Sequence, residues 1–202
     1  MTLQLHDITH AFGDHTVLGD IEVSASAGRI TTLVGPNAAG KTTLLRIASG
    51  LLVADRGTVL FQGTDLSTLS DSQRADHVAV LSQRPRPDIP LCVGEIIALG
   101  RHGRTGRDVN RLAEQLELES LLHRPYQSLS VGQQQRVGIA RLLHQHEPGG
   151  LLVLDEPNAP LDPRHTICLL RLLRAAADDG ATVVLSMHDL ALAGSIAGNG
   201  EG

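Results

Sequence analysis

The sequence predicts an α/β fold with a mainly parallel central sheet and an inserted helical subdomain. Leu151–Leu154 and Thr182–Met187 are short, largely apolar runs, which is the pattern of strands buried on both faces of a sheet. The stretch between them, Arg164–Ala176, has the apolar spacing of a helix. Strands that alternate with helices are typical of a parallel sheet, and 202 residues with 42% hydrophobic content are enough for a full core.

The first functional element lies between a predicted strand, Ile30–Val34, and a predicted helix, Thr43–Ala48. It satisfies the pattern G-x-x-x-x-G-K-[ST] with Gly35, Pro36, Asn37, Ala38, Ala39, Gly40, Lys41, Thr42 and Thr43. In such a loop the backbone N–H groups cradle phosphates, the lysine reaches the β- and γ-phosphates, and the hydroxyl ligates Mg²⁺. The strand and the helix on either side disfavour a plain glycine-rich turn. The sequence therefore predicts a P-loop NTPase core that binds a nucleotide and Mg²⁺.

The second element is the acidic end of the predicted strand at 151–154. Asp155 and Glu156 follow this apolar run directly, so their carboxylates should emerge at the carboxyl edge of the sheet, where ligands of α/β proteins bind. We expect Asp155 to hold Mg²⁺ through its water shell and Glu156 to lie near an attacking water. By itself this pairing is a weak signal, because core strands often end in acidic residues.

The third element is the start of a helix at Ser130. Ser130 and Gln133 have the spacing of a Ser-x-x-Gln capping box, and the apolar pattern of a helix follows. A helix that begins in this way presents free N–H groups and a partial positive charge, which suit an anion. Seen alone, the segment could equally be an ordinary capped surface helix.

The predicted organisation is one domain with two lobes. A nucleotide-binding core lobe comprises 1–85 and 150–202, and a helical subdomain comprises 86–149 and contains predicted helices at 93–99 and 109–118. The proline-rich segment 84–90 is the expected hinge. The glycine-rich segment 194–202 is expected to be a disordered tail, and the chain looks either naturally short or truncated.

Together the three elements resemble the ATP-binding subunit of ABC transporters over nearly the whole chain. Smaller matches fall in the family's order, namely Phe12 for the adenine-stacking aromatic, Gln83 for the Q-loop glutamine, Leu129–Gln133 for the signature motif, Ala159–Asp162 for the D-loop and His188 for the switch histidine. Each would be poor evidence alone. Together with the phosphate loop and the acidic strand end, these make seven matches in the right order, so coincidence is improbable.

The resemblance implies roles for these positions. Glu156, His188 and Gln83 would be catalytic, and Thr42, Gln83 and Asp155 would hold Mg²⁺. Phe12 and the loop 35–43 would bind ATP in one subunit, and the signature residues Ser130, Val131, Gly132 and Gln133 would meet the γ-phosphate of the other subunit in a head-to-tail homodimer. Gln83 would pass the change to membrane permease subunits, and through them indirectly to a substrate-binding protein.

The stretch Val93–Arg104 looks like the V-x-E-x-x-x-L-G-R segment of importers for iron chelates, haem and vitamin B12, with another importer type as the alternative. We expect a cytoplasmic protein, because no apolar stretch reaches about 20 residues and the N-terminus lacks the blocks of a signal peptide. The resemblance implies that it is peripheral on the inner face of the cell membrane, where the permease would hold it. Cys92 and Cys168, widely spaced and not in a CxxC, suit a reducing cytosol. The net charge of −5 argues against nucleic acid as a ligand.

The sequence disfavours three other function classes. An ABC ATPase of DNA repair or chromosome structure would need a coiled coil or zinc modules between its halves. A ribosome-associated factor would need two cassettes in one chain. A metabolic kinase or GTPase would not need 129–133, and a GTPase should show an Asn-Lys-x-Asp base reader, which this sequence lacks.

Three residues depart from the family pattern. Ala38 stands where glycine is usual, which we expect to be tolerated only if its φ is negative. Val131 replaces the first glycine of the signature and should face the nucleotide or its neighbour. Pro160 should stiffen the D-loop.

Overall fold

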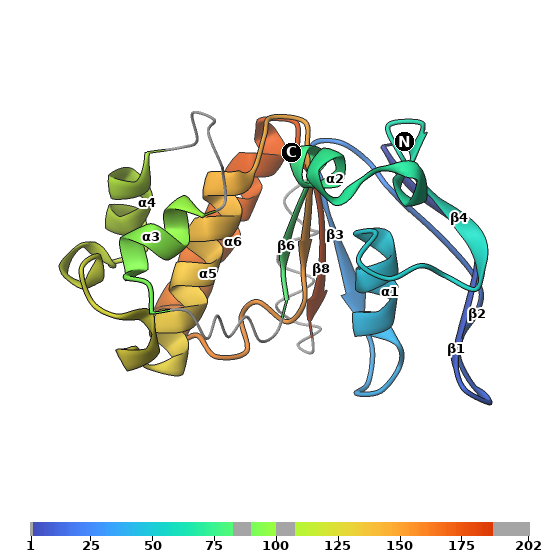
Figure 1. Ribbon diagram of the computed structural model, residues 1–202, viewed down its shortest axis with the longest axis horizontal. Coiled ribbons are helices and arrows are strands. Elements are labelled where there is room, and N and C mark those ends of the chain that lie inside the picture. The colour runs from blue at the N-terminus through green and yellow to red at the C-terminus, as the bar shows by residue number, and fades with distance from the viewer. Residues whose placement is uncertain (1, 83–89, 100–107, 188–202) are drawn as a thin grey trace.

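The computed structural model describes residues 2–82, 90–99 and 108–187 (Figure 1). Its strands are β1 (Leu3–Phe12), β2 (His15–Ala25), β3 (Arg29–Val34), β4 (Arg56–Phe61), β5 (Thr64–Asp65), β6 (Val78–Leu81), β7 (Leu151–Leu154) and β8 (Thr182–Met187). Its α-helices are α1 (Lys41–Ala48), α2 (Asp71–His77), α3 (Val93–Ala98), α4 (Val109–Gln115), α5 (Val131–Gln145) and α6 (Pro163–Asp178), joined by the short 3₁₀ turns Leu66–Thr68, Glu119–Leu121 and Tyr126–Ser128.

The central sheet is parallel, in the order β3-β8-β7-β6. Strands β6, β7 and β8 are buried almost throughout, whereas β3 at the edge is only partly buried, so alternate residues of the inner strands enter two different cores. Leu152 and Leu154 of β7 pack with α5 and α6, whereas Leu151 and Val153 pack with α1 on the opposite face. Because all four strands run the same way, their carboxyl ends meet at one edge, where the loop before α1 and the residues after β7 come together.

A second, antiparallel sheet in the order β2-β1-β4-β5 covers α1 on its far side. Leu3, Leu5 and Ile8 of β1 are almost fully buried in the same core as Leu45 and Ile47 of α1. Helix α1 is therefore held between the two sheets, as Figure 1 shows. This packing fixes the direction in which the start of α1 points.

Helices α5 and α6 cover the other face of the parallel sheet, and α3 and α4 pack on the outside of α5 (Figure 1). Gly138 allows α5 to lie close to β6, because a Cβ at this position would come within 2.8 Å of Leu81 Cδ1. None of the helices within the described residues is long and apolar enough to cross a membrane.

The predicted fold class is confirmed, including the helices α3 and α4 and the strands β7 and β8 at their predicted positions. The first of the two middle helices ends at Ala98, and the second is shorter than predicted, because the chain leaves it after Gln115 through Glu117, whose φ is 54°. The antiparallel sheet and α2 were not predicted. The hinge segment predicted at 84–90 lies almost wholly outside the described residues, and the tail at 194–202 lies entirely outside them.

Candidate nucleotide-binding site

The loop 35–40 leads from β3 into the first turn of α1. Gly40 is the N-cap of α1 with φ 83°, a left-handed conformation that glycine adopts without strain. Its lack of a side chain also matters, because a Cβ there would come within 2.9 Å of Leu18. Lys41 folds back over the loop, and its Nζ donates hydrogen bonds to the carbonyl oxygens of Gly35 at 2.7 Å and Pro36 at 2.8 Å. The loop therefore wraps around the ammonium group of Lys41.

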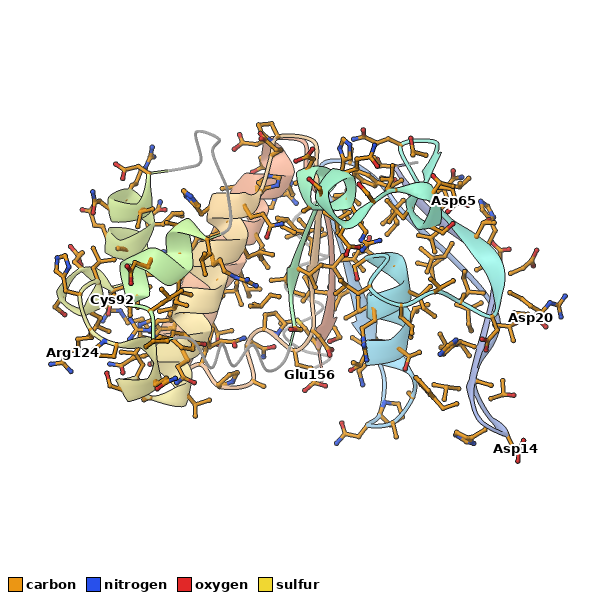
Figure 2. The ribbon with its side chains drawn as sticks, viewed as in Figure 1. Asp14, Asp20, Asp65, Cys92, Arg124 and Glu156 are labelled. Atoms are coloured by element: carbon orange, nitrogen blue, oxygen red, sulfur yellow. The ribbon has the colours of Figure 1, made fainter. Side chains whose placement is uncertain are left out.

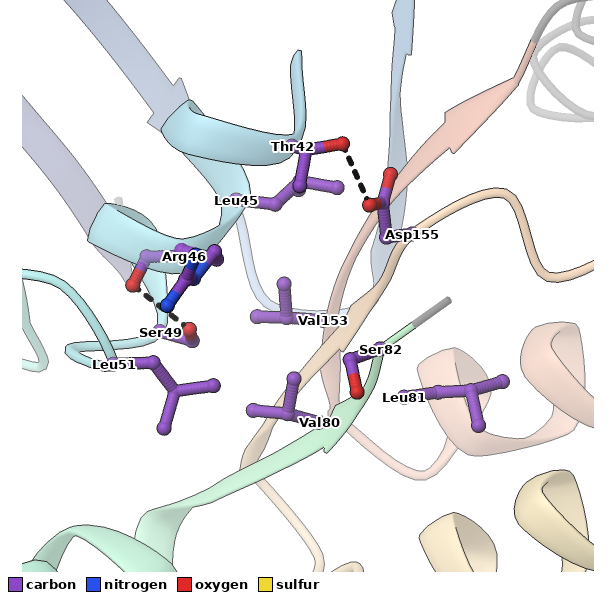
Figure 3. A pocket seen from close by; sticks show the side chains of 10 residues that line it. All are labelled: Thr42, Leu45, Arg46, Ser49, Leu51, Val80, Leu81, Ser82, Val153 and Asp155. Carbon is purple, nitrogen blue, oxygen red and sulfur yellow. Dashed lines mark hydrogen bonds between the residues drawn. The ribbon is translucent and has the colours of Figure 1, made fainter. Parts of the chain in front are cut away.

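Thr42 and Asp155 meet where the start of α1 passes the end of β7. Thr42 Oγ1 donates a 2.7 Å hydrogen bond to Asp155 Oδ2 (Figure 3). Both side chains offer hard oxygen ligands, which Mg²⁺ prefers. In such sites Mg²⁺ is commonly held by one or two protein oxygens and by substrate phosphates. The two side chains therefore fit a Mg²⁺ ion beside the phosphate loop.

Glu156 continues from Asp155 into the same site. Its backbone is left-handed, with φ 47°, which is strained for a residue with a Cβ. With Val17 and residues 37–43, it lines a polar cavity of about 410 Å³. Figure 2 shows Glu156 at one end of the parallel strands. The phosphate loop leaves the sheet at the same end, on its way from β3 to α1. The structure thus brings a carboxylate and the phosphate loop to one cavity.

The expectation for Ala38 was wrong. Its φ is +61°, so alanine adopts the left-handed conformation that glycine accommodates better. The fold of the loop holds alanine in this conformation against its local preference. The loop therefore carries strain at one exposed position.

The predicted capping box at the start of α5 is confirmed. Gln133 N–H donates to Ser130 Oγ at 3.3 Å, and Ser130 N–H donates to Gln133 Oε1 at 2.9 Å. Val131 is 70% exposed, and Gly132 lies against the D-loop, where a Cβ would come within 3.1 Å of the carbonyl oxygen of Pro160. Residues 130–133 do not line the cavity that Glu156 shares with residues 37–43, so in one subunit they stand apart from the phosphate loop.

The other predicted residues are placed less completely. Phe12 ends β1 and is 54% exposed, with its ring edge-on to His10 at a centroid distance of 4.8 Å. An exposed ring of this kind is available for stacking. Gln83 and His188 lie outside the described residues.

A second cavity of about 320 Å³ adjoins the pair Thr42 and Asp155 (Figure 3). Its remaining walls come from α1, from Leu51 after α1, and from the carboxyl-terminal halves of β6 and β7, and they include Val80, Ser82 and Val153. The candidate metal ligands therefore lie between a polar cavity and a more apolar one.

Two buried polar residues were missed from the sequence. Ser186 in β8 donates to Asp155 Oδ1 at 2.6 Å, and Gln135 in α5 donates to the carbonyl oxygen of Pro157 at 2.7 Å. The signal that could have found them is a polar side chain on an otherwise apolar face, since such a group must find a hydrogen-bond partner.

Comparison with known proteins identifies the family of this chain. A family model described as ABC transporter matches residues 18–159. The hemin import ATP-binding protein HmuV of Pseudomonas fluorescens (strain Pf0-1) is 40% identical over 95% of this chain and 78% of its own length, and the protein of the same name from Streptomyces coelicolor is 39% identical over 92% and 68%.

Solved structures give the same result. The ATP-binding subunit of an ABC transporter superposes with a TM-score of 0.87 at 27% identity, covering 97% of this chain and 83% of that one. A bacterial ABC transporter cassette solved as a dimer gives a TM-score of 0.81 at 26% identity, covering 95% and 90%. From its phosphate loop, its capped signature helix and these similarities, we conclude that the chain belongs to the ABC transporter family.

Proposed function

We propose that this chain binds and hydrolyses ATP to energise a membrane importer for haem, or for a related iron chelate or vitamin B12. The observation that carries the catalytic part is the cavity that Glu156 shares with residues 37–43, beside the hydrogen-bonded pair of Thr42 and Asp155. The similarity to hemin import ATP-binding proteins supports haem as the cargo, as does the resemblance of Val93–Arg104 to importers of that group.

In the proposed reaction the chain mostly positions groups and stabilises charge, as is general for phosphoryl transfer. The N–H groups of the loop and Lys41 hold the β- and γ-phosphates, and Lys41 exchanges its two carbonyl partners for phosphate oxygens. Thr42 and Asp155 would hold Mg²⁺, which would neutralise phosphate charge. Glu156 orients and polarises the attacking water. Gln83 and His188 remain predicted to assist at the γ-phosphate, and Phe12 to stack on adenine.

The proposed assembly is a head-to-tail homodimer. The capped start of α5 offers N–H groups and a partial positive charge without reaching the phosphate loop of its own subunit, which supports a role for Ser130, Val131, Gly132 and Gln133 at the partner's γ-phosphate. Permease subunits would hold the dimer at the inner face of the membrane. A substrate-binding protein would act through the permease.

The function is tested by deleting the gene in its own host and supplying hemin as the sole iron source. The deletion strain should fail to grow on hemin, grow normally on ferrous iron, and recover with the wild-type gene but not with Lys41→Ala. Growth on hemin at the parental rate would rule out haem as the cargo. A deletion strain that instead fails on another iron chelate or on vitamin B12 would support the corresponding importer type.

A further inference from the structure

Ser186 is a polar residue inside the buried strand β8, and its side chain is fully buried. Its hydroxyl makes two short hydrogen bonds. Glu156 N–H donates to Ser186 Oγ at 2.8 Å, and Ser186 Oγ donates to Asp155 Oδ1 at 2.6 Å. A hydroxyl has one hydrogen, so once it accepts from Glu156 its own hydrogen is directed to Asp155.

The register of the sheet explains why the three residues meet. In the parallel pairing of β7 with β8, Leu154 lies opposite Leu185. The residues that follow them, Asp155 and Ser186, are therefore also neighbours. On its other side Ser186 pairs with Leu33 of β3, which leads into the phosphate loop. Ser186 is therefore at the centre of the edge where the site is assembled.

The two bonds constrain both carboxylate residues. Asp155 has Oδ2 bonded to Thr42 and Oδ1 bonded to Ser186, so its carboxylate plane is fixed from both sides. Glu156 is held in a left-handed conformation that is unfavourable for a residue with a Cβ, and its N–H bond to Ser186 opposes relaxation of that turn. One hydroxyl thus links the candidate metal ligand to the candidate base.

We propose that Ser186 is a positioning residue for ATP hydrolysis, which holds Asp155 and Glu156 in a fixed relation to each other. The inference rests on the proposed function of those two carboxylates. Ser186 itself touches no reacting atom and acts through them. Groups that orient metal ligands in this way are commonly worth about 10–100-fold in activity, and displacement of a catalytic group by about 1 Å has an effect of similar size.

The test compares Ser186→Ala with Ser186→Thr, which keeps the hydroxyl, and with Thr182→Val as a matched control. Thr182 lies in the same strand, is equally buried, and has a hydroxyl without a hydrogen-bond partner among the described residues. Ser186→Ala should lower kcat about 10–100-fold, with KM and the calorimetric Kd for ATP little changed, because the contacts that bind ATP are kept. Ser186→Thr should keep most of the activity, and Thr182→Val should keep all of it.

A double-mutant cycle separates positioning from a general structural effect. In a Glu156→Gln background, the Ser186→Ala change should lower the residual hydrolysis less than in the wild type, because the part of the effect that acts through the Glu156 carboxylate is already lost and only the part that acts through Asp155 remains. Thermal unfolding and ATP binding of each variant are measured beside turnover. If Ser186→Ala does not fold, Ser186→Cys keeps the shape with a weaker donor and should show the same selective loss of kcat.

Unchanged kcat in a folded Ser186→Ala or Ser186→Cys variant would overturn the inference. So would an equal loss of activity in the Glu156→Gln background. Failure of the proposed function gives a different result, because the wild-type chain would then bind no ATP or produce no phosphate.

Discussion

Gln135 Nε2 donates a 2.7 Å hydrogen bond to the carbonyl oxygen of Pro157, and both residues are buried. Gln135 lies in the second turn of α5, one turn beyond Ser130, and Pro157 follows Glu156 directly. With the close approach of Gly132 to Pro160, this bond joins the signature helix to the segment that carries Glu156, the proposed catalytic carboxylate. In the proposed dimer, α5 contacts the nucleotide of the partner subunit. The bond from Gln135 thereby connects α5 to Glu156, which acts on the nucleotide of its own subunit.

Gln135→Leu should destabilise the chain and slow hydrolysis. The Pro157 carbonyl would lose its partner in a buried site, which costs about 1–3 kcal/mol. Chemical denaturation and steady-state ATP turnover measure the two effects. Gln134→Leu is the matched control, because its amide makes a longer bond of 3.3 Å to Tyr126 O, away from the site. Equal effects of the two substitutions would contradict a specific link through Gln135.

Lys41→Ala should weaken ATP binding by on the order of 100-fold, since a hydrogen bond to a charged group is worth about 1.5–3 kcal/mol. Calorimetry measures the affinity, and unchanged binding would remove the phosphate-loop assignment. Lys41 is also the only lysine in the sequence. An amine-selective reagent should therefore modify Lys41 and the N-terminus alone, and ATP should protect Lys41 but not the N-terminus.

Ala38→Gly should raise the free energy of unfolding by up to about 1 kcal/mol, because glycine relieves the left-handed strain at φ +61°. Ala39→Gly next to it should lower the free energy of unfolding, since Ala39 is not among the positive-φ residues and glycine only adds freedom to the unfolded chain. Denaturant unfolding of the two variants checks this. The same sign of change at both positions would contradict the assigned conformation.

Asp162 should make stability depend on acid pH. It is the N-cap of α6, and hydrogen bonds from the backbone N–H and then the ring of His165, both at 2.8 Å, hold the pKa of Asp162 below its usual value of 3.8. Because folding lowers this pKa, the charged carboxylate of Asp162 stabilises the folded chain at pH values above the unfolded pKa. This stabilisation is lost as pH falls through the folded pKa. Asp162→Asn keeps a cap without the charge. The difference in Tm between wild type and variant should shrink below about pH 4, and a difference that stays constant with pH would contradict this.

The parts of the site that depend on local sequence could be predicted. The phosphate loop is a short pattern with a fixed backbone role, and the Ser130–Gln133 capping box is formed within one turn of helix. Asp155 and Glu156 follow an apolar strand whose end position is visible in the sequence. In each case the residues that determine the geometry lie within a few positions of one another.

The parts that depend on distant contacts could not be predicted. Ser186 meets Asp155 only through the register of β7 with β8, and Gln135 meets Pro157 only after α5 packs on the sheet. The left-handed backbone of Ala38 and Glu156 is imposed by the loop and by the sheet edge, against the preference of either residue type. The antiparallel sheet arises from pairings between β1, β2 and β4 that the sequence pattern does not specify.

The central claim is that ATP is held between the phosphate loop of one subunit and the Ser130 end of α5 of the other. The most direct test is size-exclusion chromatography of Glu156→Gln with and without ATP, alone and combined with Ser130→Arg. Ser70→Arg is the control, because it removes an equivalent capping box, Ser70 with Gln73, from α2, which lies near the other end of α5 (Figure 1). Hydrolysis by Glu156→Gln should fall about 10²–10⁴-fold, so that ATP stays bound.

The account predicts an ATP-dependent dimer for Glu156→Gln and for its combination with Ser70→Arg. The combination with Ser130→Arg should stay monomeric and still bind ATP. A dimer that persists with Ser130→Arg, or loss of ATP binding by the Ser130→Arg monomer, would contradict the shared site.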